Sequence, residues 1–129
     1  MRAALWVRAL SESRAVYLAS ISEADFQQSV VEFLEFMGYI VWHARDSRRQ
    51  KLSGLVDLIA VSCRDPIAGR PSRKLLMWEL KTQRGRLSAA QVVALRLLAR
   101  VPGVDARCLR PAEWDALAER IKREEGIER

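Results

Sequence analysis

Two stretches decide the fold: Gly54-Leu55-Val56-Asp57-Leu58-Ile59-Ala60-Val61-Ser62 and Lys74-Leu75-Leu76-Met77-Trp78-Glu79-Leu80-Lys81. Each is an apolar, strand-forming run with a carboxylate near one end. Side chains alternate faces along a strand, so Glu79 and Lys81 should share one face. If the runs pair as an antiparallel hairpin, a turn midway between them sets Asp57 opposite Glu79. Opposed residues have Cβ atoms about 4.5–5.5 Å apart, so the two carboxylates can close on one cation. A divalent metal would offset their mutual repulsion.

Helix and strand signals alternate around this hairpin. Capping boxes open helices at Ser22-Glu23-Ala24-Asp25 and Ser88-Ala89-Ala90-Gln91, and Pro111 stands in the first turn of a last helix. Strands are expected at residues 39–43, 56–62, 74–80 and 104–109. Both faces of the hairpin are mostly apolar, so helices should cover both. The sequence predicts an α/β fold with a central sheet of about four strands, in the order α-β-β-β-α-β-α.

Length and composition indicate one globular domain. The chain has 129 residues, 50% of them hydrophobic, and we expect residues 22–123 to form the domain. Residues 1–21 would be an arm or a marginal helix, and 124–129 a charged tail. No apolar run reaches the ~18–20 residues of a membrane span, so we expect a cytoplasmic protein, with a transit peptide as the alternative. Cys63 and Cys108 are expected to be reduced, buried thiols.

The charge balance favours an anionic partner. Twenty-two Lys and Arg residues against sixteen Asp and Glu give a net charge of +6, which attracts polyanions such as nucleic acids. Basic residues flank the proposed site in two loops. The candidates for phosphate contact are Arg45, Arg48, Arg49 and Lys51 before Asp57, and Arg84 and Arg86 after Lys81. The alternative for the first group is a solvated loop.

In this order and spacing the residues resemble a nuclease family. Gly54-x-Val56-Asp57, Glu79-x-Lys81 and Gly85-Arg86-Leu87-Ser88-x-x-Gln91, behind a helix that opens at Ser22-Glu23, are similar to the PD-(D/E)XK nucleases. More narrowly they resemble the compact VRR-NUC branch, found as free-standing phage and bacterial proteins. The likeness covers roughly residues 22–121 and implies a restriction-endonuclease-like core with a mixed sheet. Val56 stands where the family usually has Pro, a residue that shapes the strand entry and binds no metal.

The resemblance assigns metal ligation to Asp57, Glu79, the Leu80 carbonyl and Glu23. The implied ion is Mg²⁺ or Mn²⁺, because hard cations prefer carboxylate, carbonyl and water oxygens. Lys81 would orient the attacking water or stabilise charge on the phosphorane.

Two of the implied residues also have local explanations. The resemblance gives Gln91 a catalytic role, as a hydrogen-bond partner of that water or of Lys81. The third position of a capping box explains Gln91 equally well. The helix dipole favours Glu23 at a first turn regardless of function, and Gln27 is a lesser candidate one turn later. For Asp57, Glu79 and Lys81 the structural alternative is an exposed ion pair at a strand end.

The function that the resemblance implies is a Mg²⁺- or Mn²⁺-dependent endonuclease that hydrolyses DNA phosphodiester bonds. Free-standing members of this branch are similar to junction resolvases, so we expect branched or four-way junction DNA as substrate and a homodimer as the active form. One alternative is a nucleic-acid-binding module that keeps the nuclease fold without cutting. The other is a restriction or defence nuclease with sequence preference. Substrate shape and the number of metal ions stay open at this point.

Overall fold

The structure, a computed structural model, describes residues 2–43, 56–63 and 74–125. These residues form an α/β arrangement of four helices and four strands. In chain order the elements are α1 (Arg2–Ser20), α2 (Glu23–Phe36), β1 (Tyr39–His43), β2 (Leu58–Ser62), β3 (Leu75–Leu80), α3 (Ala89–Ala99), β4 (Val104–Leu109) and α4 (Pro111–Glu124). The order from α2 onward is the predicted one, and β1 and β4 have the predicted bounds.

The described strands form one mixed sheet in the spatial order β1-β2-β3-β4. The β1–β2 and β2–β3 pairs are antiparallel, and β4 joins β3 in parallel after the α3 crossover. Within the β2–β3 hairpin, Leu58 lies opposite Trp78. Extended by one residue, this register sets Asp57 opposite Glu79, and the predicted register is therefore confirmed.

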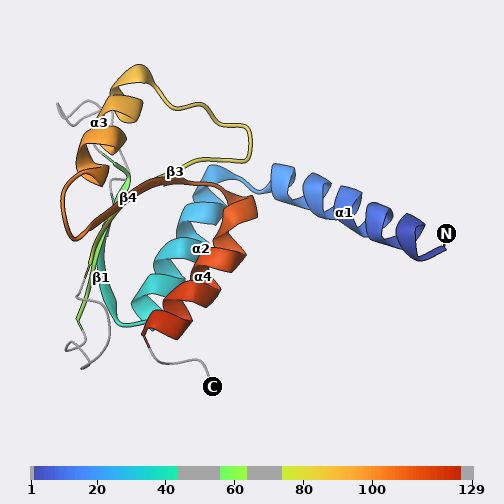
Figure 1. Cartoon of the computed structure of the whole chain (residues 1–129), viewed down its shortest axis with the longest axis horizontal. Coiled ribbons are helices and arrows are strands. Elements are labelled where there is room, and N and C mark those ends of the chain that lie inside the picture. The colour runs from blue at the N-terminus through green and yellow to red at the C-terminus, as the bar shows by residue number, and fades with distance from the viewer. Residues whose placement is uncertain (1, 44–55, 64–73, 126–129) are drawn as a thin grey trace.

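One face of the sheet carries the hydrophobic core. Figure 1 shows α2 and α4 side by side on that face, with α3 on the other side of the sheet. Alternation along β2 and β3 directs Leu58, Leu76 and Trp78 into this core, where each is at most 4% exposed. The Trp114 ring on α4 packs edge-on against Trp78 and Phe33. Burying a large apolar side chain contributes roughly 1.5–3 kcal/mol, so this layer fixes the strands that carry the candidate site.

The opposite face of the sheet is covered only in part. The helix α3 packs against β4 there, whereas Ile40 and Trp42 on β1 are 49% and 57% exposed. Helices do lie on both sides, as expected from the apolar hairpin. Among the described residues, α3 is the helix on this side; it follows β3 and leads directly into β4, so its coverage stops short of β1.

The helix ends follow the capping signals. Ser22 Oγ accepts a hydrogen bond from the Asp25 backbone N–H at 3.1 Å, and α2 begins at Glu23. After α2, Gly38 has a φ of 88°, the left-handed conformation that glycine adopts without a steric penalty. This turn leads straight into β1, so the helix and the first strand are positioned by local sequence.

Residues near the N-terminus form a helix that projects from the domain. In Figure 1, α1 extends away from the sheet and the other helices. Val16 and Tyr17 are 71% and 66% exposed, and the one ion pair described between α1 and α4, Arg14–Asp115 at 3.6 Å, is itself exposed. Exposed pairs of this kind contribute little stability. The sequence left two alternatives for this segment, an arm or a marginal helix. In the structure the segment is a helix, and it projects like an arm.

The prediction of two buried cysteines is wrong for Cys63. Cys63 is exposed, and Cys108 is partly buried; both are free. The cause is strand alternation at the end of β2: Ser62 points into the protein and is 6% exposed, so the next side chain points outward. The backbone N–H of Cys63 still donates to Gly38 O at 2.8 Å, which anchors its main chain.

Some predicted features lie outside the described residues. These are Gly54, the hairpin turn and the four basic residues Arg45, Arg48, Arg49 and Lys51. At the other end, α4 continues through Glu124, the first residue of the predicted charged tail. Across the described ranges, no helix combines the length and the apolar content that a bilayer crossing requires.

Candidate functional site

Glu79 is a buried carboxylate near the end of β3. Its side chain is 1% exposed. Oε1 accepts a hydrogen bond from Gln91 Nε2 at 2.8 Å and lies 3.4 Å from Lys81 Nζ. Oε2 is also buried and has no hydrogen-bond partner among the described residues. A buried acceptor without a partner is costly and calls for an explanation, and a bound cation would supply one.

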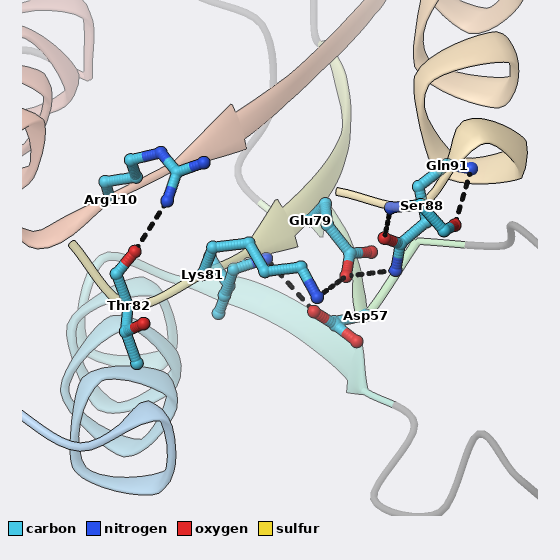
Figure 2. A network of polar contacts seen from close by, with 8 residues as sticks. Asp57, Glu79, Lys81, Thr82, Ser88, Gln91 and Arg110 are labelled. Carbon is cyan, nitrogen blue, oxygen red and sulfur yellow. Dashed lines mark hydrogen bonds and ion pairs between the residues drawn. The ribbon is translucent and has the colours of Figure 1, made fainter. Parts of the chain in front are cut away.

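Asp57 reaches the same strand end from the neighbouring strand. Its Oδ2 accepts a hydrogen bond from the Leu80 backbone N–H at 3.0 Å. The strand β2 begins only at Leu58, so the β2–β3 ladder has ended at this point. The Asp57 side chain supplies the acceptor for the Leu80 N–H in place of a main-chain carbonyl. The backbone of β3 thereby fixes Asp57 beside Glu79, as Figure 2 shows.

The environment favours the protonated form of Glu79. Burial, first of all, and the negative charge of Asp57 together raise the pKa of Glu79 to about 7, against the opposing effect of the Lys81 ammonium. A carboxylate in this setting gains more from a nearby cation than an exposed one does. When Glu79 ionises, two carboxylates face the single Lys81 ammonium, and a divalent cation would supply the missing positive charge.

Lys81 shares the face of Glu79, as strand alternation predicts. Its side chain is 18% exposed, and its stem runs along the loop that follows β3. A Cβ atom added to Gly85 would lie 3.4 Å from Lys81 Cδ and 3.0 Å from Thr82 Oγ1. The absence of a side chain at Gly85 therefore leaves the space that the Lys81 stem and Thr82 occupy.

Gln91 completes the predicted capping box and also contacts Glu79, whereas its predicted hydrogen bond to the attacking water or to Lys81 stays a prediction. Its Oε1 accepts from the Ser88 backbone N–H at 2.8 Å, and Ser88 Oγ accepts from the Gln91 N–H at 3.1 Å, which completes the predicted capping box. The other end of the same amide donates to Glu79. Figure 2 shows the two contacts on opposite sides of the Gln91 side chain. The first turn of α3 is thus joined to the buried carboxylate.

The remaining predicted residues lie at different distances from this centre. Glu23 is exposed in the first turn of α2, and Gln27 is partly buried one turn later. Arg84 and Arg86 are exposed in the loop that follows Lys81. The structure thus brings together Asp57, Glu79, Lys81 and Gln91, while it shows no contact between them and Glu23.

The donor set fits a hard divalent cation that is held by few protein ligands. No group of three or more His, Cys, Asp or Glu side chains able to hold a metal occurs within residues 2–43, 56–63 and 74–125. Mg²⁺, however, commonly uses one or two carboxylates, with water and substrate phosphate completing its shell. The two carboxylates Asp57 and Glu79, with the open Oε2, meet that smaller requirement.

Sequence reasoning missed two polar residues beside the site, Gln83 and Arg110. Arg110 Nη1 donates to Thr82 O at 2.7 Å, and Gln83 Oε1 accepts from the Ala112 N–H at 3.1 Å. Neither belongs to a motif or to an apolar period. One local signal exists in the sequence: Arg110 directly precedes Pro111, and an arginine side chain has no acceptor with which to cap the helix that starts there.

Comparisons with known proteins leave the family open. Scans against family models, curated proteins and solved structures found no match to this chain.

Proposed function

We propose that the protein is a metal-dependent endonuclease that hydrolyses DNA phosphodiester bonds. One observation carries the proposal: the buried Glu79 carboxylate has an open Oε2, with Lys81 Nζ 3.4 Å from Oε1 and Asp57 held at the same strand end. Two carboxylates and an ammonium on one face form the set that metal-assisted phosphoryl chemistry uses. A purely structural ion pair between Lys81 and Glu79 would leave the buried, unpartnered Oε2 of Glu79 unexplained.

In this proposal Asp57 and Glu79 hold a Mg²⁺ or Mn²⁺ ion. When bound, the ion would supply Lewis-acid polarisation of the scissile phosphate and a water of lowered pKa. The Leu80 carbonyl would be the further ligand, because the N–H and C=O of one strand residue point to the same edge and the Leu80 N–H already points to Asp57. Glu23 is proposed to act through water, since it is exposed.

The other residues orient the reacting groups. Lys81 Nζ would donate to the attacking water or to the phosphorane oxygens as their negative charge grows. Gln91 holds Oε1 of Glu79 in place, which would leave Oε2 available to bind the ion. Of the alternatives for Gln91, this is a positioning role rather than direct contact with the water.

The proposed substrate is DNA, with branched or four-way junction DNA as the expected form and a homodimer as the expected assembly. The net charge of +6 supports an anionic partner, and Arg84 and Arg86 are exposed close to Lys81 in the chain. The four-stranded mixed sheet with helices on both sides is compatible with the restriction-endonuclease-like core that the VRR-NUC resemblance implies. We propose membership of that branch on the motifs alone.

The experiment is a cleavage panel with matched variants. Duplex, flap, single-stranded and four-way junction DNA are incubated with Mg²⁺, Mn²⁺ or EDTA. We expect metal-dependent cutting that Asp57→Asn and Lys81→Met each reduce by about 100-fold or more. Asp115→Asn and Lys122→Met make the same charge changes in surface ion pairs and should cut normally.

The other functional classes are defined outcomes of this panel. Salt-dependent binding of all substrates with no cutting under any metal would identify a binding module. Cutting confined to particular duplex sequences, with the junction ignored, would identify a restriction or defence nuclease. Cutting that survives Asp57→Asn would reject the proposed site itself.

A further inference from the structure

The loop that follows β3 is attached to the junction of β4 and α4 residue by residue. The Lys81 N–H donates to Leu109 O at 3.0 Å, which continues the parallel β3–β4 ladder one step beyond the end of β3. At the next residue, the Thr82 carbonyl accepts from Arg110 Nη1 at 2.7 Å. A guanidinium is a charged donor, and charge-assisted hydrogen bonds of this length are among the stronger ones. Figure 2 shows Arg110 reaching this carbonyl.

The third attachment replaces the missing cap of α4. Arg110 stands at the N-cap position, but its side chain makes no capping bond. Gln83 supplies one instead, because its Oε1 accepts from the Ala112 N–H at 3.1 Å. Residues 81, 82 and 83 are therefore bound in order to residues 109, 110 and 112. Their main chain cannot shift without breaking these bonds in succession.

This attachment bears directly on the Lys81 side chain. The Gly85 N–H donates to Thr82 O at 3.2 Å, so the carbonyl held by Arg110 also closes the turn under Lys81. That turn brings Gly85 against the Lys81 stem, where an added Cβ would be 3.4 Å from Cδ. The Nζ atom is then 3.4 Å from Glu79 Oε1. Arg110 therefore fixes the Thr82 carbonyl. The same carbonyl closes the turn from Thr82 to Gly85, and this turn packs against the Lys81 stem.

We propose that Arg110 and Gln83 are positioning residues that hold Lys81 at the carboxylate pair by fixing residues 81–85 to the start of α4. The catalytic consequence rests on the proposed nuclease function; the positioning itself does not. Loss of either residue should release the Lys81 ammonium toward solvent and lower kcat, with KM for DNA little changed. An arginine that served to bind phosphate would instead raise KM.

The first test measures the position of Lys81 without any substrate. Folded protein is treated briefly with an acetylating reagent, and the modification of Lys81 is measured by peptide mass spectrometry, with Lys122 in the same chain as internal reference. We expect the Lys81 to Lys122 ratio to rise several-fold in Arg110→Ala and in Gln83→Ala. Arg120→Ala removes the same charge from an exposed pair on α4 and should leave the ratio unchanged. If Arg110→Ala fails to fold by circular dichroism, Arg110→Gln takes its place.

The second test measures the coupling to catalysis by a double-mutant cycle. Arg110→Ala alone should lower kcat about 10- to 100-fold, and Arg110→Lys, which keeps a charged donor, should recover most of the loss. In a Lys81→Met background, Arg110→Ala should have little further effect. Additive losses would overturn the proposed coupling to Lys81.

The two tests separate the two hypotheses. A protein that cuts no DNA but shows the increased Lys81 labelling contradicts the proposed function and supports the positioning. Cleavage with unchanged Lys81 labelling in folded Arg110→Ala and Gln83→Ala supports the function and overturns the positioning.

Discussion

The side-chain amide of Gln91 joins Glu79 to the start of α3: its Nε2 donates to Glu79 Oε1 at 2.8 Å, and its own Oε1 accepts from the Ser88 N–H at 2.8 Å. The backbone donor fixes which end of the amide faces Glu79. The carboxylate is consequently held by a group that the helix itself orients. One side chain, Gln91, therefore both caps α3 and orients the Glu79 carboxylate.

Replacing Gln91 with Glu should separate these two contacts. Gln91→Glu keeps an oxygen for the Ser88 N–H but loses the donor to Glu79 and adds a like charge beside it. We expect metal-dependent cleavage to fall about 10- to 100-fold, the usual cost of losing such a supporting contact, and the apparent Mg²⁺ affinity to fall with it. Initial rates measured across a Mg²⁺ titration give both quantities.

Ser88→Ala is the matched control. It removes the hydrogen bond from the Gln91 N–H to Ser88 Oγ at 3.1 Å and leaves the contact with Glu79. The cost should be about 1 kcal/mol in the free energy of unfolding, with cleavage nearly unchanged at a temperature where the protein is folded. A cleavage loss in Ser88→Ala equal to that in Gln91→Glu would mean that the cap, and not the Glu79 contact, matters.

The raised pKa of Glu79 predicts how stability depends on pH. Burial and Asp57 raise the pKa from the ordinary 4.5 to about 7 in the folded protein, so the folded state binds this proton more tightly than the unfolded state. The contribution of Glu79 to the free energy of unfolding is therefore fully present below about pH 4.5 and is lost as pH rises through about 7. At about 1.4 kcal/mol per unit, the loss amounts to roughly 3 kcal/mol.

Urea unfolding of wild type and Glu79→Gln at about pH 5 and about pH 8 checks this expectation. The neutral variant lacks the penalty of ionisation, so its stability relative to wild type should increase from the lower pH to the higher one. Saturating Mg²⁺ at the higher pH should restore stability to wild type and have no such effect on Glu79→Gln. A difference between the two proteins that is constant with pH would refute the perturbed pKa.

The hairpin and the helix ends were readable from the sequence because local rules control them. Strand alternation and a turn midway between two apolar runs suffice to pair Asp57 with Glu79, and the observed register is the predicted one. Capping residues at Ser22 and Ser88 set the starts of α2 and α3. These features depend on neighbours in the chain or on one pairing, so no knowledge of the remaining fold was needed.

Features that depend on several elements together were missed. The contacts of Arg110 with Thr82 and of Gln83 with Ala112 form only because β4 lies beside β3 in parallel. The hydrophobic periodicity of the sequence does not show which strands are neighbours in the sheet. The exposure of Trp42 on β1 likewise follows from where α3 crosses. The association of Glu23 with the carboxylate pair stays a prediction, as do the roles of the basic loop before Asp57.

Gly85→Ala should disturb Lys81 by contact alone. Gly85 does not have a positive φ, so alanine fits the backbone, but its Cβ would lie 3.0 Å from Thr82 Oγ1 and 3.4 Å from Lys81 Cδ. We expect cleavage to fall about 10-fold with a modest loss of stability. In a Thr82→Ala background the tighter contact is gone, so Gly85→Ala should then have a smaller effect; equal effects in both backgrounds would show that the loss has another cause.

The most direct measurement of the central claim is Mn²⁺ binding in the absence of DNA, followed by electron paramagnetic resonance of the free ion. We expect saturable binding at one or two ions per chain at about neutral pH, weakened at least about 10-fold by Asp57→Asn and by Glu79→Gln, and unchanged in Asp115→Asn. Equal binding by wild type and both site variants would contradict the account, because Asp57 and Glu79 would then not hold the ion.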